Sequence, residues 1–173
     1  MYACESGEWR RGETLAVHIL IYAPYQPRVM ELKEIVERQT MAIDLPIQFG
    51  LFTKLPYLLH YYEAMDITVP YVIAEGFPKE RQQASVWLKE LARAVCPAHI
   101  IAITQSGDDI KVGMYYCKGK RRFKDRRLVV LHQDQLEDFW KQEAREVEPW
   151  CKEAADIRAA LQKIREKKQC LSH

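Results

Sequence analysis

The sequence predicts a three-layer α/β protein, and three observations support this fold class. Its 173 residues, with 48% hydrophobic and 29% charged side chains, are typical of one globular domain that buries its own core. Between residues 14 and 104, apolar segments alternate with amphipathic ones, as strands and helices do in a parallel sheet covered by helices. Helical periodicity then dominates residues 133–168. We therefore expect a single domain over 1–173 that ends in a long C-terminal helix.

The expected strands are the apolar segments of the chain. The nearly continuous run over 14–23 is typical of a strand covered on both faces, which places it in the centre of the sheet. Strands over 41–52, 67–77 and 98–104 extend the parallel part. Because no helix separates the apolar segments 98–104, 110–117 and 127–132, we expect these three to form an antiparallel meander, which makes the sheet mixed.

Three helices are expected between the parallel strands. The helix over 27–40 places Val29, Leu32 and Val36 on one face. The helix over 53–66 has Thr53 as its N-cap and tolerates Pro56 in its first turn. The third helix, over 78–96, has one apolar stripe, formed by Ala84, Leu88, Leu91 and Val95.

The C-terminal helical segment, 133–168, is expected to break or kink at Pro149. Its apolar residues recur with alternating spacings of three and four, a pattern interrupted only at Glu143: Leu136, Trp140, Val147, Trp150, Ala154, Ile157, Leu161 and Ile164. Such a stripe fits another helix, which would make the segment a dimerisation element. It equally fits the protein's own sheet, and the sequence leaves both alternatives open.

Positive charge is concentrated in one segment, Lys118 to Arg127, where seven of ten residues are basic. The net charge is +6 over this segment, −3 before it and −1 after it, so the whole positive excess is local. Between two antiparallel strands the segment would form an exposed hairpin tip, because neighbouring cations repel one another when buried. Cations that displace counterions from phosphates and a ring that stacks on a base favour nucleic acid. The candidate binding residues are Lys118, Lys120, Arg121, Arg122, Phe123, Lys124, Arg126 and Arg127.

An aromatic group on the second helix is a secondary candidate. Tyr57, His60 and Tyr61 fall on the face opposite the apolar residues of that helix. Exposed rings can stack on bases or line a groove, but the simpler expectation is that the C-terminal helix covers them.

One acidic cluster provides a catalytic alternative. Glu75 follows an apolar strand, and "DDIK" places Asp108 and Asp109 close to Lys111. Metal-dependent nucleases of the restriction-endonuclease type arrange carboxylates and a lysine in a similar spacing and use Mg²⁺ or Mn²⁺. The resemblance is confined to this spacing, and "SGDD" is also an ordinary turn composition.

Other classes of site lack their sequence signals. Five cysteines occur singly, without the paired spacing of a zinc site, and no glycine-rich phosphate loop follows the first strand. No resident metal or cofactor is therefore expected. No apolar run is long enough to cross a membrane, and the N-terminal residues lack the apolar core of a signal peptide, so a cytoplasmic location is expected.

The sequence thus predicts a non-catalytic nucleic-acid-binding protein, for DNA or RNA, that contacts phosphates through a basic hairpin tip. Two alternatives stay open: the metal-dependent nuclease, and a structural or assembly protein that forms a homodimer through its C-terminal helix.

Overall fold

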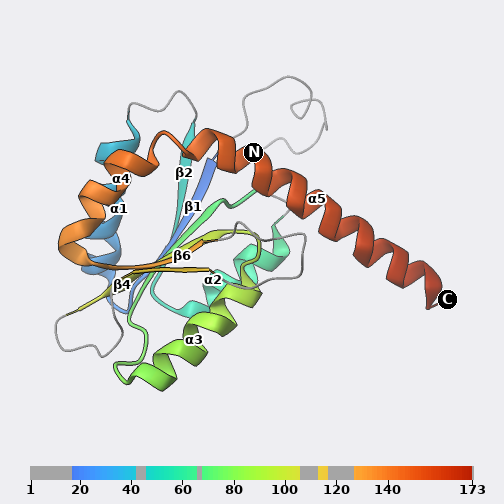
Figure 1. Cartoon of the computed structure of the whole chain (residues 1–173), viewed down its shortest axis with the longest axis horizontal. Helices are drawn as coiled ribbons and strands as arrows, with labels where there is room; N and C mark the ends of the chain where they lie inside the picture. The colour runs from blue at the N-terminus through green and yellow to red at the C-terminus, as the bar shows by residue number, and fades with distance from the viewer. Residues whose placement is uncertain (1–16, 42–45, 66–67, 106–112, 117–126, 173) are drawn as a thin grey trace.

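The computed structural model describes residues 17–41, 46–65, 68–105, 113–116 and 127–172. Strands and helices alternate through its first part, as Figure 1 shows. The strands are β1 (Val17–Tyr22), β2 (Ile47–Phe52), β3 (Tyr71–Glu75), β4 (His99–Thr104), β5 (Gly113–Tyr116) and β6 (Arg127–His132). The helices are α1 (Gln26–Thr40), α2 (Leu55–Ala64), α3 (Arg81–Ala94), the short 3-10 helix η3 (Gln133–Gln135), α4 (Leu136–Glu143) and α5 (Val147–Leu171).

The sheet has the strand order β2-β1-β3-β4-β6-β5. The first five strands in this order are all parallel. The order is doubly wound: β2 lies on one side of β1 and the later strands lie on the other side, so the strand order reverses between β1 and β3. The α/β class agrees with the expectation from the sequence, and β1 is an interior strand, although it lies second from the edge rather than in the centre. The three layers consist of this sheet and the helices on its two faces.

The expected antiparallel meander is wrong. β4 pairs with β6 in parallel, for example Ala102 with Val130, and β5 is a four-residue strand that pairs antiparallel with the outer side of β6. The strand that follows β5 in the chain therefore lies between β4 and β5, and no consecutive antiparallel triplet forms. The connection from Gln105 to Gly113 is long enough to skip one position in the sheet, and the continuously apolar β6 is better covered in the interior than near the edge.

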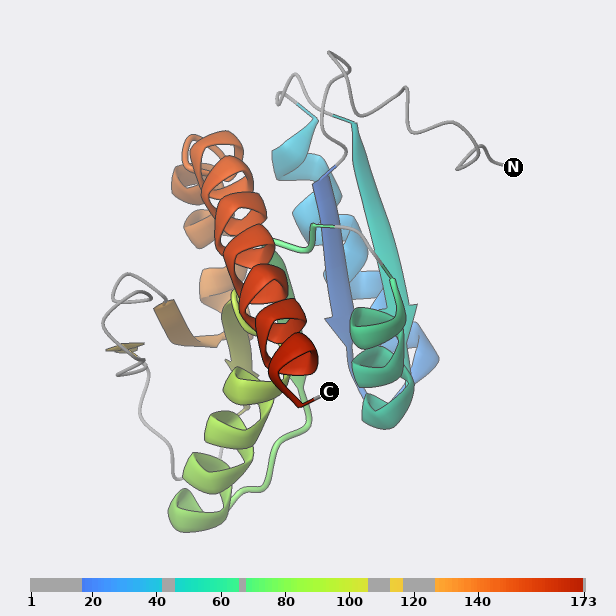
Figure 2. The ribbon, with the colours of Figure 1, turned by 90° about the vertical axis from the view of Figure 1, so that its right-hand side faces the viewer.

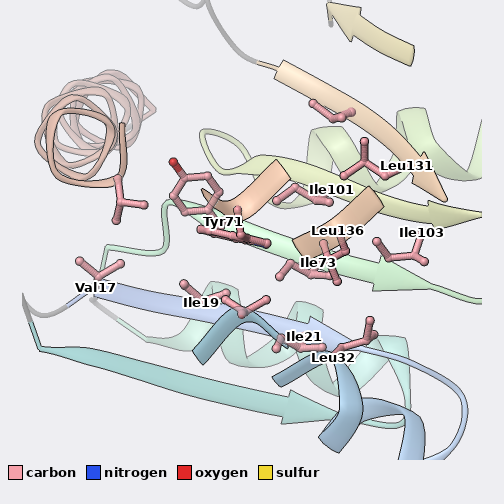
Figure 3. Close-up of a cluster of buried hydrophobic side chains, with 14 of the residues drawn as sticks. Val17, Ile19, Ile21, Leu32, Tyr71, Ile73, Ile101, Ile103, Leu131 and Leu136 are labelled. Carbon is pink, nitrogen blue, oxygen red and sulfur yellow. The ribbon is translucent and has the colours of Figure 1, made fainter. Parts of the chain in front are cut away.

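The helices cover both faces of the sheet because their apolar stripes match its two surfaces. α1, α4 and the first part of α5 pack on one face, together with side chains such as Ile19, Tyr71 and Ile101, which Figure 3 shows. α2 and α3 pack on the other face. The predicted stripes of α1 (Val29, Leu32 and Val36) and α3 (Ala84, Leu88, Leu91 and Val95) are buried, which confirms both.

The apolar stripe of the C-terminal segment packs mainly on the protein's own sheet. Leu136, Trp140, Val147, Trp150 and Ala154 are all buried in the core, and Ile157 is half-buried against it. Only Leu161 and Ile164, farther along α5, lie beyond the main core. The break in the helix falls at residues 144–146, so Pro149 lies in the first turn of α5, where a missing backbone N–H costs little.

α5 crosses the edge of the sheet at which the parallel strands begin. The Trp150 indole donates a hydrogen bond of 3.0 Å to the carbonyl of Pro70, and its ring lies on His99, with 3.5 Å between ring centroids. Farther along, Arg158 donates to the carbonyl of Met65 and lies over the Tyr62 ring. Figure 2 shows the C-terminal half of α5 extending past this edge toward α2 and α3. No helix in the described ranges is both long and apolar enough to cross a membrane.

Candidate functional site

The carboxyl ends of the parallel strands are the usual position of a site in this type of sheet. Here a buried carboxylate, Glu75, ends β3 with only 2% of its surface exposed. Arg28 reaches it from the first turn of α1, directly after β1. The Arg28 Nε atom lies 2.9 Å from each of the two Glu75 carboxylate oxygens. An ion pair of the protein itself therefore lies at the carboxyl ends of β1 and β3, where the strand order reverses.

The two terminal nitrogens of Arg28 donate to two further side chains. One terminal nitrogen donates to Glu31 in the next turn of α1, and the other donates to the side-chain carbonyl of Gln133, both at 2.8 Å. Burial alone would lower the pKa of the guanidinium, but hydrogen bonds and charge from Glu75 and Glu31 outweigh burial and raise this pKa. Arg28 is therefore a fixed cation that ties α1, β3 and η3 together.

Gly76, which follows β3, lies close to Pro24, which follows β1, at the same end of the strands. Its φ of +87° is in the region that favours glycine, and a Cβ atom there would lie 2.6 Å from Pro24 Cγ. The backbone after β3 thus approaches the backbone after β1 too closely for a larger residue. The space between these two strand ends is filled by protein atoms.

We expect Gly76→Ala to lower the free energy of unfolding by about 2 kcal/mol, because alanine is strained at this φ and its methyl group displaces the Pro24 ring. Chemical denaturation followed by circular dichroism measures the loss. Gly50→Ala is a control for added bulk alone: its Cβ would lie 2.6 Å from Leu20 Cδ2, as close as the Gly76 contact, but its backbone needs no positive φ. A loss at Gly76 no larger than the loss at Gly50 would contradict the conformational argument.

The structure describes only one of the four residues of the nuclease alternative. Glu75 is buried and engaged by Arg28, whereas Asp108, Asp109 and Lys111 lie outside the described residues. Within the described ranges, no group of three or more His, Cys, Asp or Glu side chains could hold a metal ion. A divalent cation at Glu75 would have to displace a guanidinium that contacts both carboxylate oxygens.

The described residues next to the basic segment are Tyr116, which precedes it, and Arg127, which ends it. Lys118, Lys120, Arg121, Arg122, Phe123, Lys124 and Arg126 lie outside the described residues, and only the backbone of Arg127 is described. Arg127 pairs with Tyr116 at the amino end of β6. Glu75 lies at the opposite edge, at the carboxyl end of β3. The sheet thus separates the anchors of the basic segment from the candidate carboxylate by the length of a strand.

The predicted aromatic face of α2 is exposed and is not covered by α5, so the expectation of a covering helix is wrong. Tyr57 is 64% exposed, and His60 is exposed too. Tyr61 is half-buried against Phe52 of β2, with 5.5 Å between ring centroids. α5 passes beyond the end of α2 and reaches Met65 and Tyr62 instead.

Sequence reasoning missed Arg28, whose partners on other elements, Glu75 and Gln133, lie 47 and 105 residues away. The available signal was its position in the first helical turn after the first strand, which is the edge where a charged side chain meets the ends of neighbouring strands. A second group, the Cys151 thiol, is buried in the core, and burial followed by the charge of Glu148 raises its pKa. Cys151 is therefore a protonated core residue rather than a nucleophile.

The fold and this edge together define a doubly wound α/β protein whose strand-order reversal is closed by an internal ion pair. No protein-family model and no curated protein matches the sequence. A comparison with solved structures finds eleven matching chains. One of them, the constitutive lysine decarboxylase of E. coli, is 15% identical with a TM-score of 0.43, and the match covers 81% of this chain. The chain spans only 18% of the length of that decarboxylase chain.

Proposed function

We propose that this protein is a non-catalytic nucleic-acid-binding protein that contacts phosphates through the basic segment 118–127. The observation that carries the proposal is the concentration of charge: seven Lys or Arg side chains in ten residues, in a protein whose remaining residues are net negative. Several cations within one Debye length, about 8 Å at physiological salt, attract a polyanion even when the whole molecule is nearly neutral.

The anchors of the segment support this proposal. Tyr116 and Arg127 are paired, so the two ends of the segment start from adjacent strands at the outer side of the sheet. A charged connection at this position meets solvent with less desolvation than one in the core. Phosphate contacts of this kind hold nucleic acid without reading its sequence, so binding is expected to be largely independent of sequence.

The buried Arg28–Glu75 pair favours binding over catalysis. Glu75 is the one member of the predicted metal cluster that the structure describes, and both of its oxygens contact the guanidinium. Its edge of the sheet is opposite the anchors of the basic segment. Nucleic acid held at the basic segment would therefore approach the molecule from the end away from Glu75.

The test is a salt titration of binding to a labelled single strand and a labelled duplex. Replacing Lys120, Arg121, Arg122 and Lys124 with glutamine should flatten the slope of log K against log salt by about three to four units, because each lost phosphate contact removes about 0.7–0.9 of slope. Affinity at low salt should fall as well. An unchanged slope would overturn the proposal.

A matched variant controls for net charge. Lys79, Arg81, Lys89 and Arg93 are exposed cations on or next to α3, and their replacement with glutamine removes the same charge elsewhere. Its slope should stay close to that of the unmodified protein. Parallel incubations with Mg²⁺ or Mn²⁺ separate binding from cleavage, and cutting that is lost in Asp109→Ala would support the nuclease instead.

A further inference from the structure

Among the residues that the structure describes, the outer edge of β2 has no neighbouring strand. β2 is the first strand in the sheet order, and no strand lies beyond it in the part of the chain that the structure describes. Proteins usually protect such an edge with charged residues, proline or a β-bulge. The six residues of β2, IQFGLF, contain no charge and no proline, and their register with β1 is continuous. This strand is therefore ready to pair on its free side.

The direction of the free backbone groups follows from the pairing with β1. The carbonyls of Pro46 and Phe52 accept hydrogen bonds from Val17 and Ala23, so alternate residues from 46 to 52 face β1. Because the backbone groups of a strand alternate between its two sides, the N–H and C=O groups of the intervening residues point outward. These residues are Ile47, Phe49 and Leu51.

Apolar side chains flank this edge on both faces of the sheet. On the α1 face, a groove of about 660 Å³ is lined by Ile47, Phe49 and Leu51 and by Met41, which is 80% exposed at the end of α1. On the other face, Tyr61 packs on Phe52, and the exposed Tyr57 lies one helical turn away on the same side of α2. The aromatic face of α2 thus borders the same edge.

The charges at the groove suit a second copy of the same chain. Lys33 and Glu37 line the groove, 3.6 Å apart, so its rim has one cation and one anion. Two copies related by a twofold axis can exchange these partners, with each Lys33 pairing with the partner's Glu37. Two copies of an uncharged strand also meet without like-charge repulsion. By contrast, the far half of α5 combines Leu161 and Ile164 with Arg158, Arg165 and Lys167, which would repel their equivalents.

We propose that the protein forms a homodimer through antiparallel pairing of the β2 edges of two copies. With a twofold axis at Phe49, this residue pairs with the partner's Phe49 and Ile47 pairs with the partner's Leu51. Each such pair exchanges two backbone hydrogen bonds, because its N–H and C=O groups point across the interface. The two sheets become one continuous sheet, and Met41 and Tyr57 are covered. This proposal does not depend on nucleic-acid binding.

Sedimentation velocity of the full chain over a range of concentrations tests the proposal. The unmodified protein should be a dimer that dissociates on dilution. Met41→Lys places a charge where an exposed apolar side chain lines the groove, and Ile47→Pro removes an outward N–H group that the internal ladder does not use. Each should weaken dimerisation by about tenfold or more and leave the circular dichroism spectrum unchanged.

Val86→Lys is the matched control, because Val86 is 56% exposed on α3, away from β2, and should leave the dimer intact. Three results would overturn the proposal. The first is an unmodified protein that is monomeric at all concentrations. The second is a dimer that persists in both edge variants, and the third is a dimer that Val86→Lys disrupts as strongly as Met41→Lys does.

Discussion

Replacing Trp140 with alanine is expected to lower the free energy of unfolding by about 3–5 kcal/mol, the usual cost of emptying a buried tryptophan site. Trp140 has no exposed surface, and its ring contacts Tyr71 of β3, with 5.1 Å between ring centroids. It lies on the apolar stripe that, from sequence, fitted either the protein's own sheet or a second copy. Chemical denaturation followed by far-ultraviolet circular dichroism measures the loss.

Trp140→Phe is the matched control. It retains an aromatic ring and removes an indole N–H that is buried without a hydrogen-bond partner in the described part of the chain, so a much smaller loss is expected. The destabilisation by Trp140→Ala should also be the same at low and high protein concentration. A loss that appears only in a concentration-dependent transition would show that the stripe serves an interface between copies.

Removing the Arg28 side chain should have the second largest effect. Arg28→Ala is expected to destabilise the fold by about 3 kcal/mol, because it leaves the carboxylate of Glu75 buried without its cation. The value is at the low end for such pairs, since 18% of the Arg28 side chain remains exposed. The same denaturation measurement applies. The effect should be mainly on stability, because Arg28 is engaged by protein atoms on all three nitrogens.

A double-mutant cycle separates the ion pair from the loss of packing. When Glu75→Gln accompanies Arg28→Ala, the buried charge is absent, and part of the stability lost in the single variant should return. Lys152→Ala supplies the comparison for an exposed pair, because Lys152 and Glu148 lie 3.4 Å apart on the surface of α5, and less than about 0.5 kcal/mol is expected there. Equal losses at Arg28 and Lys152 would contradict the account of Arg28 as a buried tie.

The helices and the parallel strands could be predicted because burial leaves a local pattern. The stripe Val29, Leu32 and Val36 has helical spacing, and these side chains are buried against the sheet. The exact ends of the helices were harder to predict from the sequence. The N-cap of α2 is Lys54 rather than Thr53, and the helix has no side-chain cap, because a lysine side chain has no acceptor for a backbone N–H.

The neighbours of each strand could not be predicted in the same way. An apolar strand such as β6 indicates that it is covered, but nothing in "RLVVLH" specifies β4 rather than β5 as its inner neighbour. The choice depends on how far the preceding connection reaches. The continuous apolar run of β6 was the one local sign of an interior position.

The same difference between local pattern and tertiary contact applies to the candidate site. Glu75 was identifiable because it follows an apolar strand, and its burial at the carboxyl edge agrees with that position. Its partner was not identifiable, because an ion pair between residues 28 and 75 is a product of the tertiary fold. The basic segment was the most visible feature of the sequence, and its part in nucleic-acid binding stays a prediction.

The interleaved position of β6 has a consequence for synthesis on the ribosome. β4, which is entirely buried in the finished protein, has no neighbour on one side until β6 leaves the ribosome. At about 5–20 residues per second, the intervening residues leave the apolar margin of β4 uncovered for a second or more. The nascent chain is therefore open to wrong associations in this interval, and a ribosome that stalled there would present an incomplete sheet to the chaperones of the cell.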